Sequence, residues 1–298
     1  MNGAVLQELS GELAARLAKP PEGPSILELA HGIHDGVPAE QYYRRVFGVA
    51  SKSGLDLVRR APALYKAWCD GLELEETAAL RFGTALHTAI LEPDRFARVY
   101  VAEPDFGDCR KKENKARRDA WRAENAHATA LDADDAARIA GMRESLMRHA
   151  LVRKLVENAR REVTAKWTDR PTGIISKSRW DLWLDPIGTI ADLKSTEDAS
   201  PDAFKRSVAK WGYHRQHSMY EDGGRACGAD VRNFAFIAAE KAPPYLVAVY
   251  NLDEQAVNKG REEIERLFRT LAECVESGIW PGYPAGITSL SLPRWYGE

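Results

Sequence analysis

The chain has 298 residues, of which 44% are hydrophobic and 29% charged, a composition typical of a folded globular protein. Its net charge of −2 argues against a uniformly basic nucleic-acid coat but leaves room for a local basic surface. No apolar run approaches the roughly 20 residues of a membrane span, and no secretory pattern opens the chain, so we expect a cytoplasmic protein. The four cysteines form no CxxC pair, which gives zinc-ribbon and iron–sulfur sites little support.

The first strong helical pattern follows a weakly patterned N-terminal stretch. Residues 1–50 contain one predicted amphipathic helix, at 6–17, and have no defined role. A helix is predicted over 77–91, where apolar residues recur and a proline ends the run. His87 lies in this helix, and a lone histidine on a mostly apolar helix is more often a core residue than a ligand. The small residue Gly83, one turn earlier, would allow another backbone or a ligand to approach closely.

A basic segment comes next. Seven Lys or Arg residues fall between 110 and 122 against two acidic residues, and a helix is predicted over 111–126. Most charge runs are solvated helix faces, but so dense a cluster fits a phosphate-contacting surface equally well. The candidate contacts are Lys111, Lys112, Lys115 and Arg118.

From residue 162 the hydrophobic period changes from helical to alternating. Runs at 163–167, 174–184 and 189–196 are separated by turn residues, which predicts a three-stranded antiparallel meander. Two helices are predicted after it, at 200–212 and 214–227, then strands at 231–239 and 245–252. A long helix is predicted from 253 to 277. We therefore expect a mixed α/β fold with a central sheet flanked by helices.

The second hairpin of this meander brings charged side chains together. If the loop is centred between Pro186 and Ile187, Asp181 lies opposite Asp192, with Cβ atoms roughly 4.5–5.5 Å apart. Lys194 lies on the same strand face as Asp192. Two carboxylates and a lysine at one place suit a hard divalent cation. From spacing alone, a solvated face with one ion pair is the commoner meaning, and a loop of three or five residues would remove the opposition.

These residues make the chain resemble the PD-(D/E)XK nuclease superfamily, and in particular its exonuclease VIII-like, RecB-like branch. The superfamily motif is an Asp on one strand and an acidic residue two before a Lys on the next, as in Asp181 and Asp192-Leu193-Lys194. Gln216 and Tyr220 fit the QxxxY helix, and 83–87 resembles the histidine-bearing helix. The resemblance covers roughly 51–298, the expected nuclease domain. One departure is Trp180, where the signature has Pro.

The resemblance implies a restriction-endonuclease-like core and a metal site. Asp181, Asp192, His87 and the Leu193 carbonyl would hold Mg²⁺, or Mn²⁺ in its place. Lys194 would orient water and offset transition-state charge. Gln216 and Tyr220 would position the phosphate or the DNA end, and the basic helix would contact the DNA backbone. Two further acids are candidates for support of the metal ligands, namely Glu92 and Glu162.

The function implied by the resemblance is 5′-to-3′ exonucleolytic digestion of linear double-stranded DNA in phage recombination. A ring-shaped homo-oligomer and a single-strand annealing partner are implied as well. Two alternatives stay open. One is an endonuclease or single-strand nuclease of the same superfamily. The other is a non-catalytic DNA-binding protein on the same fold, against which the retention of Asp181, Asp192 and Lys194 argues.

Overall fold

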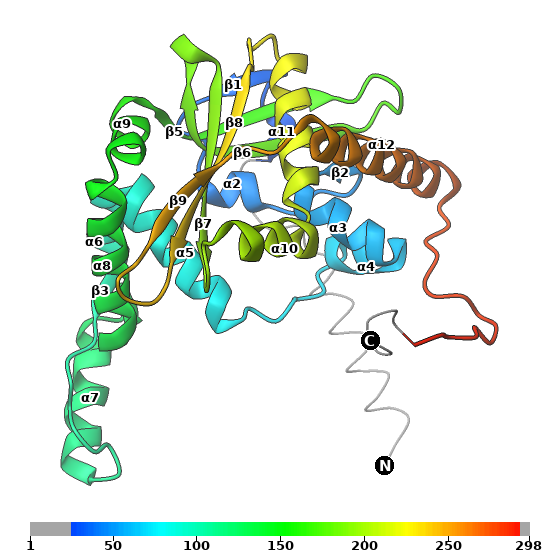
Figure 1. Ribbon diagram of the computed structural model, residues 1–298. Coiled ribbons are helices and arrows are strands. Elements are labelled where there is room, and N and C mark those ends of the chain that lie inside the picture. Colours follow the sequence, from blue (N-terminus) through cyan, green and yellow to red (C-terminus); the bar gives the residue numbers. More distant parts are fainter. Residues whose placement is uncertain (1–24, 293–298) are drawn as a thin grey trace, which may run out of the picture.

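The computed structural model describes residues 25–292, so the helix predicted at 6–17 lies outside the described range. Helices cover both faces of a central mixed sheet (Figure 1), which confirms the predicted α/β fold. The sheet strands in this range are β1 (Gly32–His34), β2 (Val49–Ala50), β5 (Arg160–Thr168), β6 (Ile175–Leu184), β7 (Thr189–Thr196), β8 (Asn233–Glu240) and β9 (Val247–Tyr250). They lie in the order β1-β5-β6-β7-β8-β9, with β2 beside β6.

The predicted meander forms the middle of the sheet. β5, β6 and β7 pair antiparallel in sequence, and β7 then pairs in parallel with β8. Trp180 of β6 is fully buried, and its ring centroid lies 5.2 Å from that of Trp183. The residue that replaces the signature proline therefore contributes core packing, the largest apolar contribution that one side chain can make.

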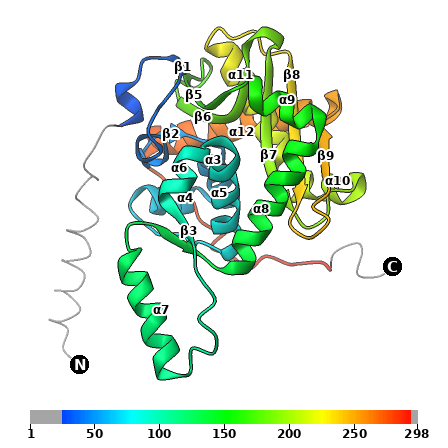
Figure 2. The same cartoon turned by 90° about the vertical axis from the view of Figure 1, so that its left-hand side faces the viewer.

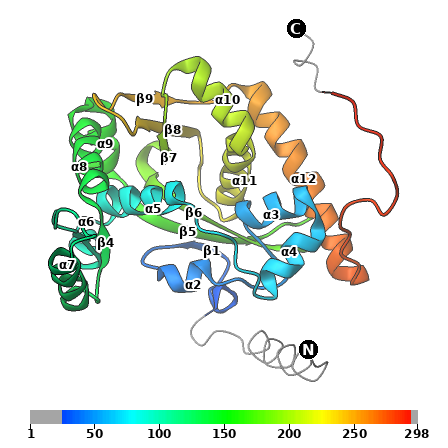
Figure 3. The same ribbon diagram turned by 90° about the horizontal axis from the view of Figure 1, so that it is seen from below.

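Two helical layers enclose the sheet (Figure 3). One face is covered by α3 (Lys52–Arg60), α4 (Pro62–Cys69), α10 (Pro201–Trp211), α11 (Tyr213–Ala226) and α12 (Glu254–Ser277). The other is covered by α5 (Ala78–Leu91), α8 (Ala133–Arg148) and α9 (Ala150–Asn158). Gly260 lets α12 approach α11 closely, because a Cβ there would lie 2.2 Å from the His214 carbonyl oxygen.

The segment before residue 51 packs on the sheet through β1, β2, a short 3-10 helix (Ile26–Glu28) and α2 (Ala39–Tyr43). Lys166 and Lys177 lie directly opposite each other on β5 and β6, and both are buried. Their ammonium groups donate to four backbone carbonyls of this segment, those of Leu27, Leu29, Tyr42 and Arg44. Burial lowers the pKa of Lys177 to about 8. The domain boundary at residue 50 stays a prediction.

A basic arm, which we define as residues 103–128, projects from the body of the protein (Figure 2). It contains α7 (Lys112–Glu124) and is flanked by β3 (Tyr100–Ala102) and β4 (Thr129–Leu131), which pair in parallel. The short helix α6 (Pro93–Val99) joins it to α5. No helix in the described part of the chain is long and apolar enough to span a bilayer.

Candidate active site

The site forms where β6 and β7 part, a place that we call the strand fork. The two strands pair at Leu182–Ala191, Trp183–Ile190 and Leu184–Thr189, and a four-residue turn joins them. This is the predicted register, and it makes Asp181 and Asp192 the next opposed residues. Nearer its start, β6 pairs with β2, whereas β7 stays beside β8. The sheet therefore opens beside the two carboxylates, and helices from both layers reach them.

Asp181 is held by the backbone of β7. Its Oδ2 accepts a hydrogen bond from the Leu193 amide at 2.7 Å. Burial raises the pKa of the Asp181 carboxyl. His87, Lys194 and the Leu193 amide together lower it by a larger amount, so the net shift is downward. Asp181 is therefore an anion in a nearly closed site.

His87 reaches the fork from α5. Its Nε2 lies 2.8 Å from the Leu193 carbonyl oxygen and 3.2 Å from Asp181 Oδ2, and its Nδ1 lies 2.8 Å from the Gly83 carbonyl oxygen. Carbonyl oxygens only accept hydrogen bonds, so both ring nitrogens carry protons in this arrangement. Burial lowers the pKa of His87, but the charge and hydrogen bond of Asp181 raise it to about 9.

Asp192 is held from the opposite layer. Gln216 Nε2 of α11 donates to its Oδ1 at 2.5 Å, and Lys194 Nζ lies 2.6 Å from its Oδ2. Burial raises the pKa of Asp192, and the nearby Asp181 charge adds to this effect, although Lys194 opposes it. The predicted Gln216 thus contacts a predicted carboxylate. The predicted Tyr220 lies one turn later on α11, buried with its ring 6.3 Å from that of Phe234.

Lys194 also contacts an aromatic ring. Its Nζ lies 4.8 Å from the ring centroid of Tyr213, the first residue of α11. Burial lowers the pKa of Lys194, but Asp192, Tyr213 and Asp181 together raise it by more, so the net shift is upward. Lys194 is therefore an ammonium group in the neutral pH range.

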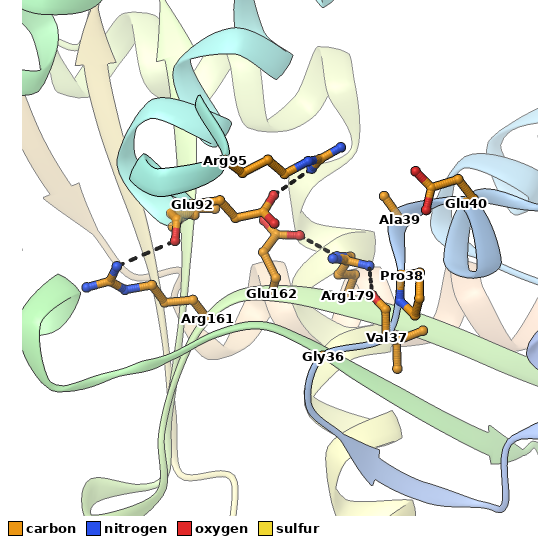
Figure 4. Close-up of a pocket in the computed structure, with 11 residues that line it drawn as sticks. Gly36, Val37, Pro38, Ala39, Glu40, Glu92, Arg95, Arg161, Glu162 and Arg179 are labelled. Carbon is orange, nitrogen blue, oxygen red and sulfur yellow. Dashed lines mark hydrogen bonds and ion pairs between the residues drawn. The ribbon is translucent and has the colours of Figure 1, made fainter. Parts of the chain in front are cut away.

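A cavity of about 430 Å³ lies beside the fork and contains both acids predicted to support the metal ligands (Figure 4). Glu162 of β5 lies across from Asp181, between the pairs Arg161–Leu182 and Val163–Trp180. Its carboxylate is bound by Arg179, and its backbone has a φ of 54°, which is rare for a residue with a side chain. Burial and the Asp181 charge raise the pKa of Glu162. Glu92 pairs with Arg95 at 2.7 Å.

Part of this donor set fits a metal ion. In an octahedral Mg²⁺ site with bonds near 2.1 Å, adjacent donor atoms lie about 3.0 Å apart. The distances from His87 Nε2 to the Leu193 oxygen and to Asp181 Oδ2, 2.8 and 3.2 Å, bracket this value. Asp192 differs, since Gln216 donates to its Oδ1 and Lys194 forms an ion pair with its Oδ2, a buried atom that accepts no hydrogen bond. Residues 25–292 contain no group of three acidic, histidine or cysteine side chains arranged as ligands. Coordination would require His87 to lose a proton and Asp192 to exchange a partner.

The basic arm lies apart from the fork (Figure 1). No residue of α7 is buried, and Lys111, Lys112 and Lys115 form no ion pair within the described chain. Arg118 pairs with Asp119 at 3.1 Å. Lys111, Lys115 and Arg118 are spaced four and three apart, so they share one side of the helix.

Two residues contact the predicted site residues but were not themselves predicted, namely Tyr213, which contacts Lys194, and Arg179, which contacts Glu162. Tyr213 precedes Gln216 by three positions, a spacing that places both on one helix face. Arg179 precedes Asp181 by two positions on one strand. These spacings could have indicated that Tyr213 and Arg179 lie near the site. The sequence does not show which ring contacts Lys194, or that Arg179 forms an ion pair with Glu162.

The chain is similar to one protein family and to solved structures. Residues 51–291 match a family model described as "PDDEXK-like domain of unknown function (DUF3799)". A solved structure from Eubacterium rectale, described as a "putative exonuclease", has a TM-score of 0.60 at 14% identity, covering 87% of this chain and 96% of its own. A phage-related exonuclease from Haemophilus somnus 129PT has a TM-score of 0.32 at 12% identity, covering 65% and 95%. No curated protein matches. On the match over residues 51–291, the chain belongs to the family of PDDEXK-like domains.

Proposed function

We propose that this protein is a divalent-metal-dependent exodeoxyribonuclease. The observation that carries the proposal is the strand fork, where Asp181, Asp192 and Lys194 meet His87 from one helical layer and Gln216 from the other. Such a set can hold a cation and stabilise negative charge at one point, which phosphodiester hydrolysis requires. An exonuclease is favoured over other nucleases because the structure with a TM-score of 0.60 is described as one.

The residues have separable roles in this proposal. Asp181, His87 and the Leu193 carbonyl would hold Mg²⁺ or Mn²⁺, with Asp192 joining them on release of one partner. When bound, the ion would polarise the scissile phosphate and lower the pKa of a bound water. In the reaction, the water oxygen forms a bond to phosphorus, the bond to the leaving oxygen breaks, and the water proton ends on that oxygen.

Lys194 acts as an ammonium group. Because it has only donors, it orients the attacking water through the water's lone pair and offsets charge on the phosphate oxygens. Its raised pKa argues against a role as a general base. Gln216 holds Asp192, and Tyr220 is buried one turn later on the same helix.

The basic arm is proposed to contact the DNA backbone through Lys111, Lys112, Lys115 and Arg118. Phosphate contacts hold a duplex without reading its sequence, which suits a nuclease that digests any linear DNA. Digestion from 5′ ends, a recombination role, a ring-shaped oligomer, an annealing partner and a cytoplasmic location stay predictions from the resemblance and composition.

The test is digestion of linear duplex DNA with and without Mg²⁺, by the wild type and by Asp192→Ala. We expect a loss of at least about 10³-fold in kcat for Asp192→Ala. Glu197→Ala is the matched control, because Glu197 follows β7 and its side chain is 81% exposed, and it should keep wild-type activity. Equal activity in wild type and Asp192→Ala would contradict the site.

Substrate form separates the alternatives. Circular duplex should resist an exonuclease, whereas an endonuclease would cut it, and a single-strand nuclease would prefer denatured DNA. DNA binding without digestion at any metal would favour a non-catalytic binding protein.

A further inference from the structure

The geometry points to Tyr213 as a positioning residue that fixes the ammonium group of Lys194 at the strand fork. This inference rests on the proposed function for its kinetic part alone. The Lys194 side chain is 18% exposed and carries four methylene groups, so many rotamers would be open to it without fixed partners. Two partners hold it, Asp192 Oδ2 at 2.6 Å and the face of Tyr213 at 4.8 Å from the ring centroid. A ring face attracts an ammonium group through its quadrupole.

The ring itself has little freedom. It stacks on Phe236 of β8, with centroids 5.5 Å apart and an interplanar angle of 26°, and it lies 5.9 Å from the ring of Phe204 of α10. Both phenylalanines are buried. Gly212, with a φ of 67°, ends α10 and starts α11, so Tyr213 lies at the junction of the two helices. A ring anchored by two buried neighbours can therefore act as a fixed surface.

A second cation explains why the ring is needed. Lys52 of α3 lies close enough to Lys194 for the charge of Lys194 to lower its pKa, although burial is the larger cause. The Lys52 ammonium is bound by Asp56 at 2.7 Å and by the Trp211 carbonyl at 2.7 Å. Asp192 attracts the Lys194 ammonium from one direction only. The Tyr213 ring attracts it from another direction, and less strongly than a second carboxylate would.

The experiment compares Tyr213→Phe, which keeps the ring, with Tyr213→Leu, which removes it. We expect Tyr213→Phe to keep kcat within about twofold, and Tyr213→Leu to lower kcat about tenfold with an unchanged KM for DNA. Tyr65→Leu is the matched control, because Tyr65 is also buried and its ring stacks on that of Trp280 rather than on Tyr213. It should lower the melting temperature comparably and leave kcat unchanged.

A measurement without activity completes the test. By NMR, the Lys194 ε-CH₂ protons should be shifted upfield by the ring current in wild type and Tyr213→Phe, and the shift should vanish in Tyr213→Leu. Wild-type Lys194 signals in Tyr213→Leu would overturn the inference. Equal kcat losses in both Tyr213 variants would also overturn it, since the hydroxyl would then act. If the wild type digests no DNA, the proposed function fails, while the NMR shift still decides how Lys194 is held.

Discussion

The strand fork and the basic arm both carry cationic side chains, but they hold them differently. At the fork, Lys194 is in contact with a carboxylate and a ring, and Asp192 is 3% exposed. On the arm, three lysines lack ion pairs within residues 25–292, and α7 buries no residue. The arm is held mainly by its own contacts, such as Arg122 with Glu103 at 2.8 Å and the ring of Phe106 near that of Trp121.

This difference separates two uses of charge. Buried charges act through position, since each one is oriented by a neighbour and little solvent screens it. Exposed charges act through their number, because salt screens each of them and no single geometry is required. We therefore expect changes at the fork to alter kcat and changes on the arm to alter DNA affinity and its salt dependence.

After the loss of Asp192 itself, the largest effect should come from removing Gln216, which donates to Asp192 at the fork. Gln216→Leu leaves Asp192 Oδ1 buried without a hydrogen bond, so the carboxylate should turn toward Lys194, and kcat should fall roughly 10²-fold. Gln41→Leu is the matched control, because Gln41 is also buried and its Nε2 donates to the Ser25 carbonyl at 3.0 Å. It should lower stability without changing kcat. Steady-state kinetics with thermal unfolding would distinguish the two, and a kcat loss in Gln41→Leu would contradict the separation.

An intermediate effect concerns His217 of α11 and the way in which the free energy of unfolding changes with pH. His217 stacks on Phe234 at 4.5 Å, and burial, with Arg261 and Arg225, lowers its pKa from 6.5 to about 4. Between these values the unfolded chain binds a proton that the folded chain does not. The free energy of unfolding should therefore decrease as the pH falls from 6.5 to 4, by up to about 3 kcal/mol from this residue.

Denaturant unfolding of His217→Phe, which keeps the stacked ring, measures that contribution. Its stability should fall less steeply than that of the wild type over pH 4–6.5. Phe268→Leu is the control, because it changes a buried ring that does not titrate, and it should keep the wild-type slope. Parallel pH curves for His217→Phe and the wild type would show that His217 is protonated in the folded state.

The smallest effect belongs to single charges on the arm. Lys115→Ala should reduce the slope of log K against log salt by about 0.9 on duplex DNA and weaken binding about fivefold near 0.1 M salt, with kcat at saturating DNA unchanged. Lys259→Ala on α12 is the control, since Lys259 is a surface lysine far along the chain that pairs with Glu262. Titrations at several salt concentrations would measure the slope. An unchanged slope in Lys115→Ala would make α7 a solvated helix without a DNA role.

Sequence pattern predicted the parts of the molecule that local rules determine. The register of β6 and β7 is the one that a turn centred between Pro186 and Ile187 gives, so the opposition of Asp181 and Asp192 expected for that turn is confirmed. The helix ending at Leu91 was predicted to within a residue, because Thr77 caps it and Pro93 follows it.

Other features depend on contacts between distant segments and carry no local signal. β1 and β2 have three and two residues, too few for a period to appear. The left-handed backbone of Glu162 is typical of glycine, so its residue type gives no warning of it. Which ring contacts Lys194 depends on how α11 crosses the sheet. Residue spacing along one helix cannot predict that crossing.

The two opposed lysines of β5 and β6 set a limit on how the protein can be shortened. Lys166 and Lys177 rely on backbone oxygens of residues 27–44, and Arg179 takes the Val37 carbonyl as well. A fragment starting at residue 51, where the family match begins, would leave these buried cations without acceptors. Arg179 would also lose one of the contacts that orient it toward Glu162, beside Asp181. The smallest fragment that keeps these buried cations paired therefore begins well before the stretch that defines the family.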